Sequence, residues 1–115
     1  MIDVTFLRQG ASPILEITAL GTEITNATVY VTIDQGDIQI TKSNYKNNDP
    51  SITMRANGSD TDITVILSQE ETLRLRPGSA RVQLRWIFDD GTADASDMGR
   101  IEIGEALLKG VIRHG

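Results

Sequence analysis

Two stretches of strict alternation between apolar and polar residues constrain this chain more than any other feature. Residues 27–33 and residues 80–88 both follow the pattern, and their apolar positions are Ala27, Val29, Val31, Ile33, Val82, Leu84, Trp86 and Phe88. A period of two places successive side chains on opposite faces of an extended strand. An α-helix, with its period of 3.6, cannot gather this pattern on one face. Both segments are therefore predicted to be half-buried strands, with Trp86 in the buried set.

The same alternation predicts further short strands, each bounded by turn residues. They cover residues 4–7, 14–20, 38–41, 52–56, 61–67 and 100–103, and their predicted core positions are Leu15, Ile17, Ala19, Ile52, Met54, Ile63, Val65, Leu67, Ile101 and Ile103. Asp34-Gln35-Gly36-Asp37 has turn chemistry and predicts a hairpin between residues 27–33 and 38–41. Seven to eight short strands with turns between them predict an all-β, antiparallel β-sandwich.

One segment departs from the strand pattern. Ser68 stands before Gln69-Glu70-Glu71, which is the spacing of a capping box, with Ser68 as the N-cap and Glu71 reaching back to it. A short helical turn is predicted from Ser68 to about Leu73. Pro77-Gly78 prevents a longer helix, because proline cannot continue one.

Length and composition limit the organisation and the partners. The 115 residues suit one domain, with residues 104–115 as a possible docking tail in which Leu107, Leu108, Val111 and Ile112 are apolar. This tail is either a last strand buried on both faces or a segment that docks on a neighbour. The net charge of −5 disfavours nucleic acid as a partner. The first residues have neither a signal peptide pattern nor an apolar span, so we expect synthesis in the cytoplasm and no membrane partner.

The residues that usually carry catalysis are scarce. The chain has no cysteine, and its one histidine, His114, is the penultimate residue. Catalytic triads and most transition-metal sites need more than this, so we expect no enzymatic activity and no cofactor. Residues 89–97 hold four aspartates, which favour a solvated turn and leave a calcium site as an alternative. A hydrolase built on paired carboxylates also stays open, because the sequence does not show which acids converge.

A row of polar side chains is the most notable surface feature of the sequence. Arg81, Gln83 and Arg85 occupy the outward phase of residues 80–88, and Arg74 and Arg76 could add to them. Arginine is enriched at protein interfaces, but it also serves on solvated sheet faces. The row is a candidate interface, together with the four apolar residues of the tail.

The order of motifs along the chain resembles a known family. Residues 6–17, which contain Gln9-Gly10-Ala11-Ser12-Pro13 between two strands, are similar to the start of immunoglobulin-like domains in phage baseplate and tail proteins. Residues 24–33, residues 68–78 and the segment from Val82 to Gly91 resemble the later elements of that family, whose best-described members are the N-terminal domains of upper baseplate proteins in phages of Gram-positive bacteria.

The resemblance implies an immunoglobulin-like sandwich in a phage or prophage structural protein that acts by protein–protein assembly. Its partners would be other virion or tail subunits or further copies of itself, and it would join a virion assembled in the bacterial cytoplasm. The family implies no catalytic residues. The alternative is a binding module for a cell-surface polysaccharide, which needs an exposed aromatic platform.

Overall fold

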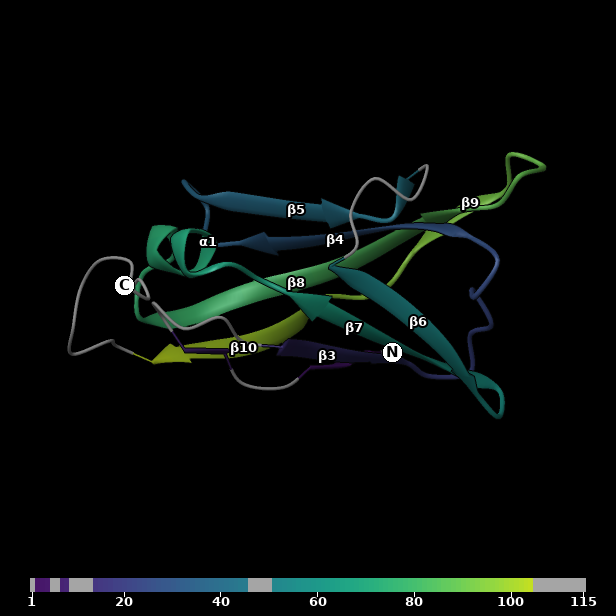
Figure 1. Cartoon of the computed structure of the whole chain (residues 1–115), viewed down its shortest axis with the longest axis horizontal. Helices are drawn as coiled ribbons and strands as arrows, with labels where there is room; N and C mark the ends of the chain where they lie inside the picture. Colours follow the sequence, from purple (N-terminus) through teal and green to yellow (C-terminus); the bar gives the residue numbers. More distant parts are fainter. Residues whose placement is uncertain (1, 5–6, 9–13, 46–50, 105–115) are drawn as a thin grey trace, which may run out of the picture.

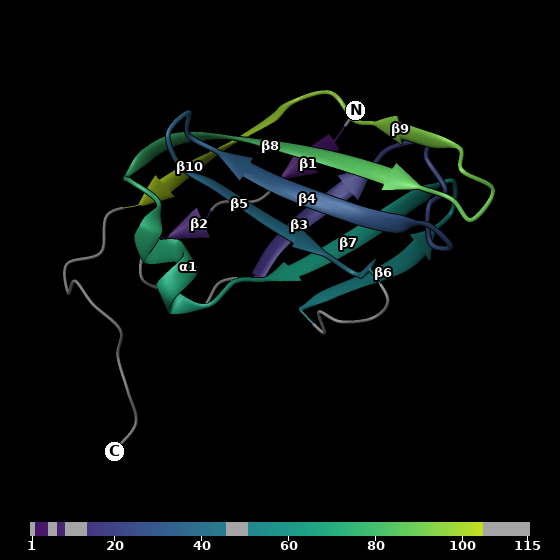
Figure 2. The same ribbon diagram turned by 90° about the horizontal axis from the view of Figure 1, so that it is seen from above.

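Two β-sheets pack face to face in this protein (Figures 1 and 2). The computed structural model describes residues 2–4, 7–8, 14–45 and 51–104. Among these residues it has ten strands and one short helix. The first sheet has the strand order β1 (Ile2–Val4), β3 (Ile14–Ala19), β7 (Asp60–Ile66) and β6 (Ile52–Asn57).

The second sheet has six strands. Its order is β2 (Leu7–Arg8), β10 (Gly99–Gly104), β8 (Gly78–Ile87), β4 (Thr28–Asp34) and β5 (Gln39–Ser43), with β9 (Ala93–Ala95) paired to β8. Strand pairing is antiparallel except between β2 and β10, which run parallel. The first β-segment is divided between the two sheets, and the remaining strands follow the order of an immunoglobulin-like sandwich. The predicted fold class is confirmed.

Two details of the strands differ from the prediction. The first predicted strand, residues 4–7, is replaced by β1 and β2, which pair in different sheets. Residues 89–97, expected as a turn, contain the short strand β9, which pairs with the second half of β8. Ala93, Asp94 and Ala95 have little intrinsic preference for a strand. They become one because β8 extends beyond β10 and offers an unpaired edge.

The core lies between the sheets and is almost wholly aliphatic. The alternating positions predicted for β3, β4, β7 and β10 are buried, as are Val82 and Leu84 of β8. Met54, Trp86 and Phe88 are partly buried and pack against this core. Because the chain has no cysteine, no disulfide joins the sheets, and side-chain packing holds them together.

The helix α1 (Gln69–Arg74) lies at the end of the sandwich opposite the β8–β9 hairpin (Figures 1 and 2). The predicted capping box is confirmed: the Glu71 N–H donates to Ser68 Oγ at 3.0 Å, and the Ser68 N–H donates to Glu71 Oε1 at 2.9 Å. Leu75 follows the helix and is fully buried, which anchors the end of this segment in the core. No helix in the described part of the chain is long and apolar enough to cross a membrane.

Candidate assembly surface

The outer face of the six-stranded sheet presents the outward phase of β8. Arg81 and Arg85 are exposed, and Gln83 between them is half-buried. Tyr30 of β4 stands opposite Arg85 in the register, and Ala95 of β9 stands opposite Arg85 on its other side. The sequence prediction that this row points away from the core is therefore correct.

Two members of the row are already engaged within the chain. Arg81 forms an ion pair with Asp34 of β4, and this hydrogen bond holds the pKa of Asp34 below its ordinary value. The amide of Gln83 donates from Nε2 to the Ser96 carbonyl at 3.1 Å. Arg81 therefore joins β8 to β4, and Gln83 joins β8 to the segment between β9 and β10.

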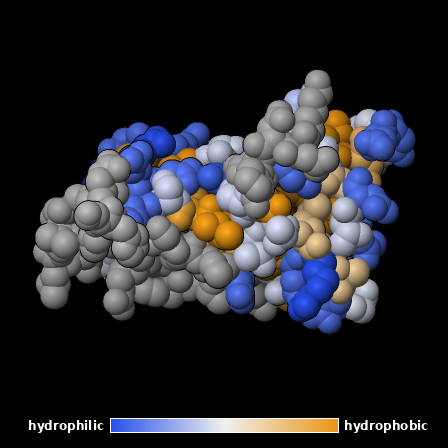
Figure 3. Space-filling model, viewed as in Figure 1, coloured by the Kyte–Doolittle hydropathy of each residue, from blue (hydrophilic) through white to orange (hydrophobic). Residues whose placement is uncertain are grey.

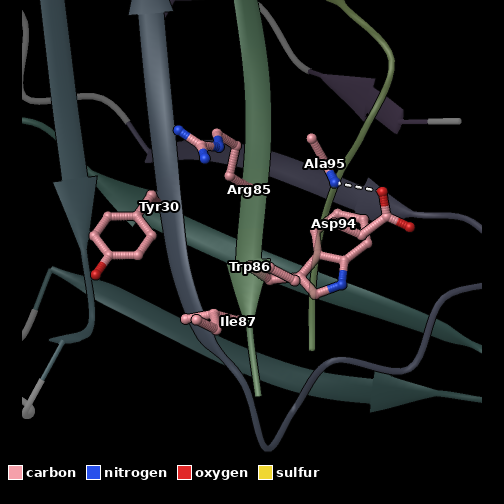
Figure 4. A pocket seen from close by; sticks show the side chains of 7 residues that line it. Tyr30, Arg85, Trp86, Ile87, Asp94 and Ala95 are labelled. Atoms are coloured by element: carbon pink, nitrogen blue, oxygen red, sulfur yellow. Dashed lines mark hydrogen bonds between the residues drawn. The ribbon is translucent and has the colours of Figure 1, made fainter. Parts of the chain in front are cut away.

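Arg85 differs from its two neighbours. In the part of the chain that the structure describes, no hydrogen bond or ion pair holds its guanidinium. It lines a depression of about 580 Å³ with Tyr30, Ile87, Ala93 and Ala95, and Trp86 and Asp94 also line it (Figure 4). We call Tyr30, Arg85, Ile87, Ala93 and Ala95 the β9 shelf. It combines one cation with small and large apolar groups on the paired strands β4, β8 and β9.

Ser96 fixes the end of β9, which carries Ala93 and Ala95 of the shelf, against β8. The Ser96 N–H donates to the Leu84 carbonyl at 2.7 Å, and the Leu84 N–H donates to Ser96 Oγ at 3.0 Å. The serine hydroxyl thus takes the place of a backbone carbonyl in the ladder. This local break lies between the pairing of β8 with β9 and its pairing with β10, so both short strands share one edge of β8.

The tip of the β8–β9 hairpin is acidic. Asp89 and Asp90 are exposed, and the Asp90 carboxylate accepts the Thr92 N–H at 2.8 Å, which lowers the Asp90 pKa. Asp94 accepts the Ala95 N–H at 2.8 Å. Within the described ranges, no three His, Asp or Glu side chains are grouped so as to hold a metal ion. In Figure 3, hydrophobic surface lies at this end of the molecule next to hydrophilic surface.

Arg74 and Arg76 do not extend the row of β8. Arg74 donates to the Gln39 carbonyl at 3.3 Å, and Arg76 pairs with Asp37 at 2.7 Å. The pairing with Asp37 raises the pKa of Arg76. Both arginines belong to α1 and the segment after it, so they fasten that segment to the β4–β5 hairpin. The suggestion that they join the surface row is wrong.

Trp86, expected to be buried, packs against the core but is only half-buried. Its position in the alternation of β8 is an inward one, and it pairs with the buried Val29 of β4. It lies one residue before the end of β8, at the end of the sandwich. Tyr30 has the outward phase of β4. Because alternate side chains of a strand point to opposite faces, Tyr30 and Trp86 do not form a shared aromatic platform.

Several predicted residues lie outside the described ranges. These are the tail residues Leu107, Leu108, Val111 and Ile112, together with His114. The sequence reasoning also missed most of the shelf. One signal was present in the sequence, because Ile87 is a large apolar residue in the otherwise polar phase of residues 80–88. It is 40% exposed in the structure.

Comparison with models of known protein families finds no match for this chain, and comparison with functionally characterised proteins also finds none.

Proposed function

We propose that this chain is a structural subunit that acts by protein–protein assembly, with no catalytic role of its own, and that the assembly is a phage or prophage particle. The observation that carries the assembly role is the β9 shelf, where the exposed Ile87 lies beside Arg85 on a rigid sheet. Exposed apolar groups with an arginine are typical of the centre of protein interfaces. The order of motifs described above supports the phage context.

The mechanism is that of a rigid block. The two sheets and their aliphatic core hold the shelf in place, so a partner meets a surface that is already formed. Binding then loses little conformational entropy, which favours ordered assembly. The other virion or tail subunits would contact the shelf, and Arg81 and Gln83 would mainly keep the sheet in register.

Purified particles test this proposal. Particles released by the bacterium that encodes the chain are separated on a density gradient and analysed by mass spectrometry, and we expect the chain in the particle fraction. An Ile87→Asp chain should be depleted from particles, because a charge at the shelf opposes burial. Arg100→Asp, an exposed change on β10 of the same sheet, is the control. A chain found only outside the particle fraction would contradict the proposal.

Binding of a cell-surface polysaccharide is the second candidate. The depression of about 580 Å³ favours it, because its volume lies in the range of small-ligand sites and Tyr30 offers one aromatic ring. Titration with purified cell-wall polysaccharide, followed by intrinsic fluorescence and iodide quenching, tests it. Saturable binding that Tyr30→Ala abolishes would support this function, and an unchanged spectrum would contradict it.

A further inference from the structure

We infer that β6 pairs antiparallel with β6 of a second copy of this chain, about a two-fold axis at Met54, so that the two four-stranded sheets join into one. This contact lies outside the β9 shelf, so the inference goes beyond the proposed function. It is carried by the open edge of β6 and by the order of side chains along that strand.

The pairing of β6 with β7 directs the backbone groups of every second β6 residue towards the open edge. The Ile66 N–H donates to the Ser51 carbonyl at 2.8 Å, and these two residues stand opposite each other when the register of β6 and β7 is continued. Hydrogen-bonded and non-hydrogen-bonded pairs alternate along an antiparallel ladder. The N–H and C=O groups of Ile52, Met54 and Ala56 therefore point away from β7. Among the described strands, β6 is the outermost of its sheet on this side (Figure 2).

Among the described edge strands, β6 is the least protected against pairing. It is six residues long, and it has neither a proline nor a charged side chain in its inward phase. The edge strands β1, β2 and β9 have only two or three residues each. The edge of β5 is engaged by α1, because Arg74 donates to the Gln39 carbonyl at 3.3 Å and Lys42 points inward to Glu71. Sandwiches block their edges by such devices, and an edge that lacks them is open to a further strand.

The order of side chains along β6 fits its own reverse. With the two-fold axis at Met54, Ile52 of each copy lies opposite Ala56 of the other, so a large side chain meets a small one. Thr53 lies opposite Arg55 on the outer face, so the two arginines do not oppose each other. The edge groups of both strands all find partners in this register. A two-fold contact requires such reciprocity, in which residue i meets j and j meets i.

Other two-fold registers of β6 are poorer. An axis at Arg55 would place the two Arg55 side chains directly opposite each other, and like charges in that position destabilise a sheet. An axis at Thr53 would carry Ala56 beyond Ile52, where β6 of the other copy begins. The Met54 register avoids both faults.

Charge and size indicate a weak dimer. The chain carries a net charge of −5, but β6 contains one arginine and no carboxylate, so two copies meet here along a strand without negative charge. Arg55 is free to adjust, because its side chain is 84% exposed and lies 3.9 Å from Asp62. A contact through one edge strand is smaller than the ~1,200–2,000 Å² of a stable complex. We therefore expect association only at high concentration.

Sedimentation velocity on the full chain, over a concentration series that reaches the millimolar range, tests the inference. The average mass of the wild-type chain should rise towards that of a dimer. Ala56→Pro removes an edge N–H and keeps the pairing with β7, since proline is tolerated where the N–H faces outward. It should weaken association by roughly tenfold or more, because the two-fold axis removes the bond twice. Thr41→Pro changes the matching outward position of β5 and should leave association unchanged. Circular dichroism melts verify that each variant is folded.

Cysteine cross-linking measures the register directly. The natural chain has no cysteine, so each introduced thiol is the only one in its chain. A mixture of Thr53→Cys and Arg55→Cys chains, oxidised with glutathione disulfide, should form a cross-linked dimer. Opposite residues of a non-hydrogen-bonded pair have Cα atoms about 4.5 Å apart, which a disulfide can span. Either variant alone should cross-link more slowly, because its two thiols are then diagonal neighbours.

Three results would overturn the inference. They are a wild-type chain that stays monomeric throughout the series, a wild-type dimer that Ala56→Pro does not weaken, and a cysteine mixture that cross-links no faster than the single variants. If Ala56→Pro fails to fold, the cysteine mixture decides.

The inference and the proposed function fail separately, because they use different surfaces. If the free chain dimerises through β6 but particles lack it, the virion role is overturned and the β6 contact stands. If particles contain the chain and the free chain stays monomeric, the β6 contact is overturned and the virion role stands.

Discussion

The Lys42 ammonium donates to both carboxylate oxygens of Glu71, each at 3.1 Å, and so joins the edge strand β5 to α1. Lys42 lies two residues after the buried Ile40, in the core-facing phase of β5. Its side chain is only 14% exposed and that of Glu71 is 23% exposed. Glu71 also accepts the Ser68 N–H, so one carboxylate completes the capping box and pairs the lysine. Burying a lysine at this position is tolerable because the carboxylate meets it.

The Glu71 carboxylate should make stability depend on acid pH. Burial raises its pKa, but the Ser68 N–H and Lys42 outweigh burial and lower it overall. A lowered native pKa stabilises the fold fully above the unfolded value of about 4.3, and the contribution is lost as pH falls through the native value. Glu71→Gln keeps a capping-box residue without the charge. We expect the melting temperatures of wild type and Glu71→Gln to differ at pH 7 and to converge below pH ~4. A constant difference across this range would contradict the assignment.

Thr61 should contribute to stability through its hydroxyl rather than its shape. The side chain is fully buried, donates to the Thr22 carbonyl at 2.7 Å and accepts the Ile24 N–H at 3.1 Å. Thr61→Val keeps the volume and leaves the buried Ile24 N–H without its acceptor, at a cost of about 1–3 kcal/mol in the free energy of unfolding. Urea denaturation measures this. Thr53→Val, on the exposed side of β6, is the matched control, and equal effects of the two changes would refute the expectation.

Ser96 should hold β9, and with it the Ala93 and Ala95 side of the shelf, against β8. Ser96→Ala removes the acceptor of the Leu84 N–H, so hydrogen exchange of the Leu84 amide should become faster while the core of β7 stays protected. Ser79→Ala is the control, since its hydroxyl donates to Glu102 at an exposed site. Unchanged exchange of the Leu84 amide in Ser96→Ala would show that the serine hydroxyl is not needed where the pairing of β8 passes from β9 to β10.

Burial should separate two similar aliphatic substitutions. Leu84→Ala empties a fully buried site in the centre of β8 and should lower the free energy of unfolding by about 2–5 kcal/mol. Ile66→Ala, at a side chain that is 47% exposed, should change it by less than ~1 kcal/mol. Chemical denaturation of both variants measures the difference. Comparable losses would mean that Ile66 is covered in solution, for example by another chain.

Much of the fold was predictable from local pattern. The alternation at residues 27–33 and 80–88 indicated both the strands and their buried faces, because a strand in a two-layer sandwich faces the core on one side and solvent on the other. The capping box at Ser68 and Glu71 was equally readable, since its two hydrogen bonds join residues three apart. Interactions of short range leave a signature in the order of residues.

The candidate site was predicted only in part. Arg85 was identified from its outward phase, but the phase alone did not distinguish it from Arg81 and Gln83. Those two are engaged by Asp34 and Ser96, whose positions depend on strand pairing and on a hairpin. The sequence also suggested that Arg74 and Arg76 join the row, but α1 and the segment after it direct them to the β4–β5 hairpin.

The amino-acid sequence by itself determined the all-β class, the inward and outward faces of the main strands and the single helical turn, because each follows from the stereochemistry of neighbouring residues. The tertiary structure decided that Ala93–Ala95 forms a strand, that Trp86 stays half-buried and that Arg85 lies beside Ile87 without an ion pair among the described residues. These features depend on which distant segments meet at the end of β8. Such pairing reflects the packing free energy of the whole sandwich rather than the preference of any one segment.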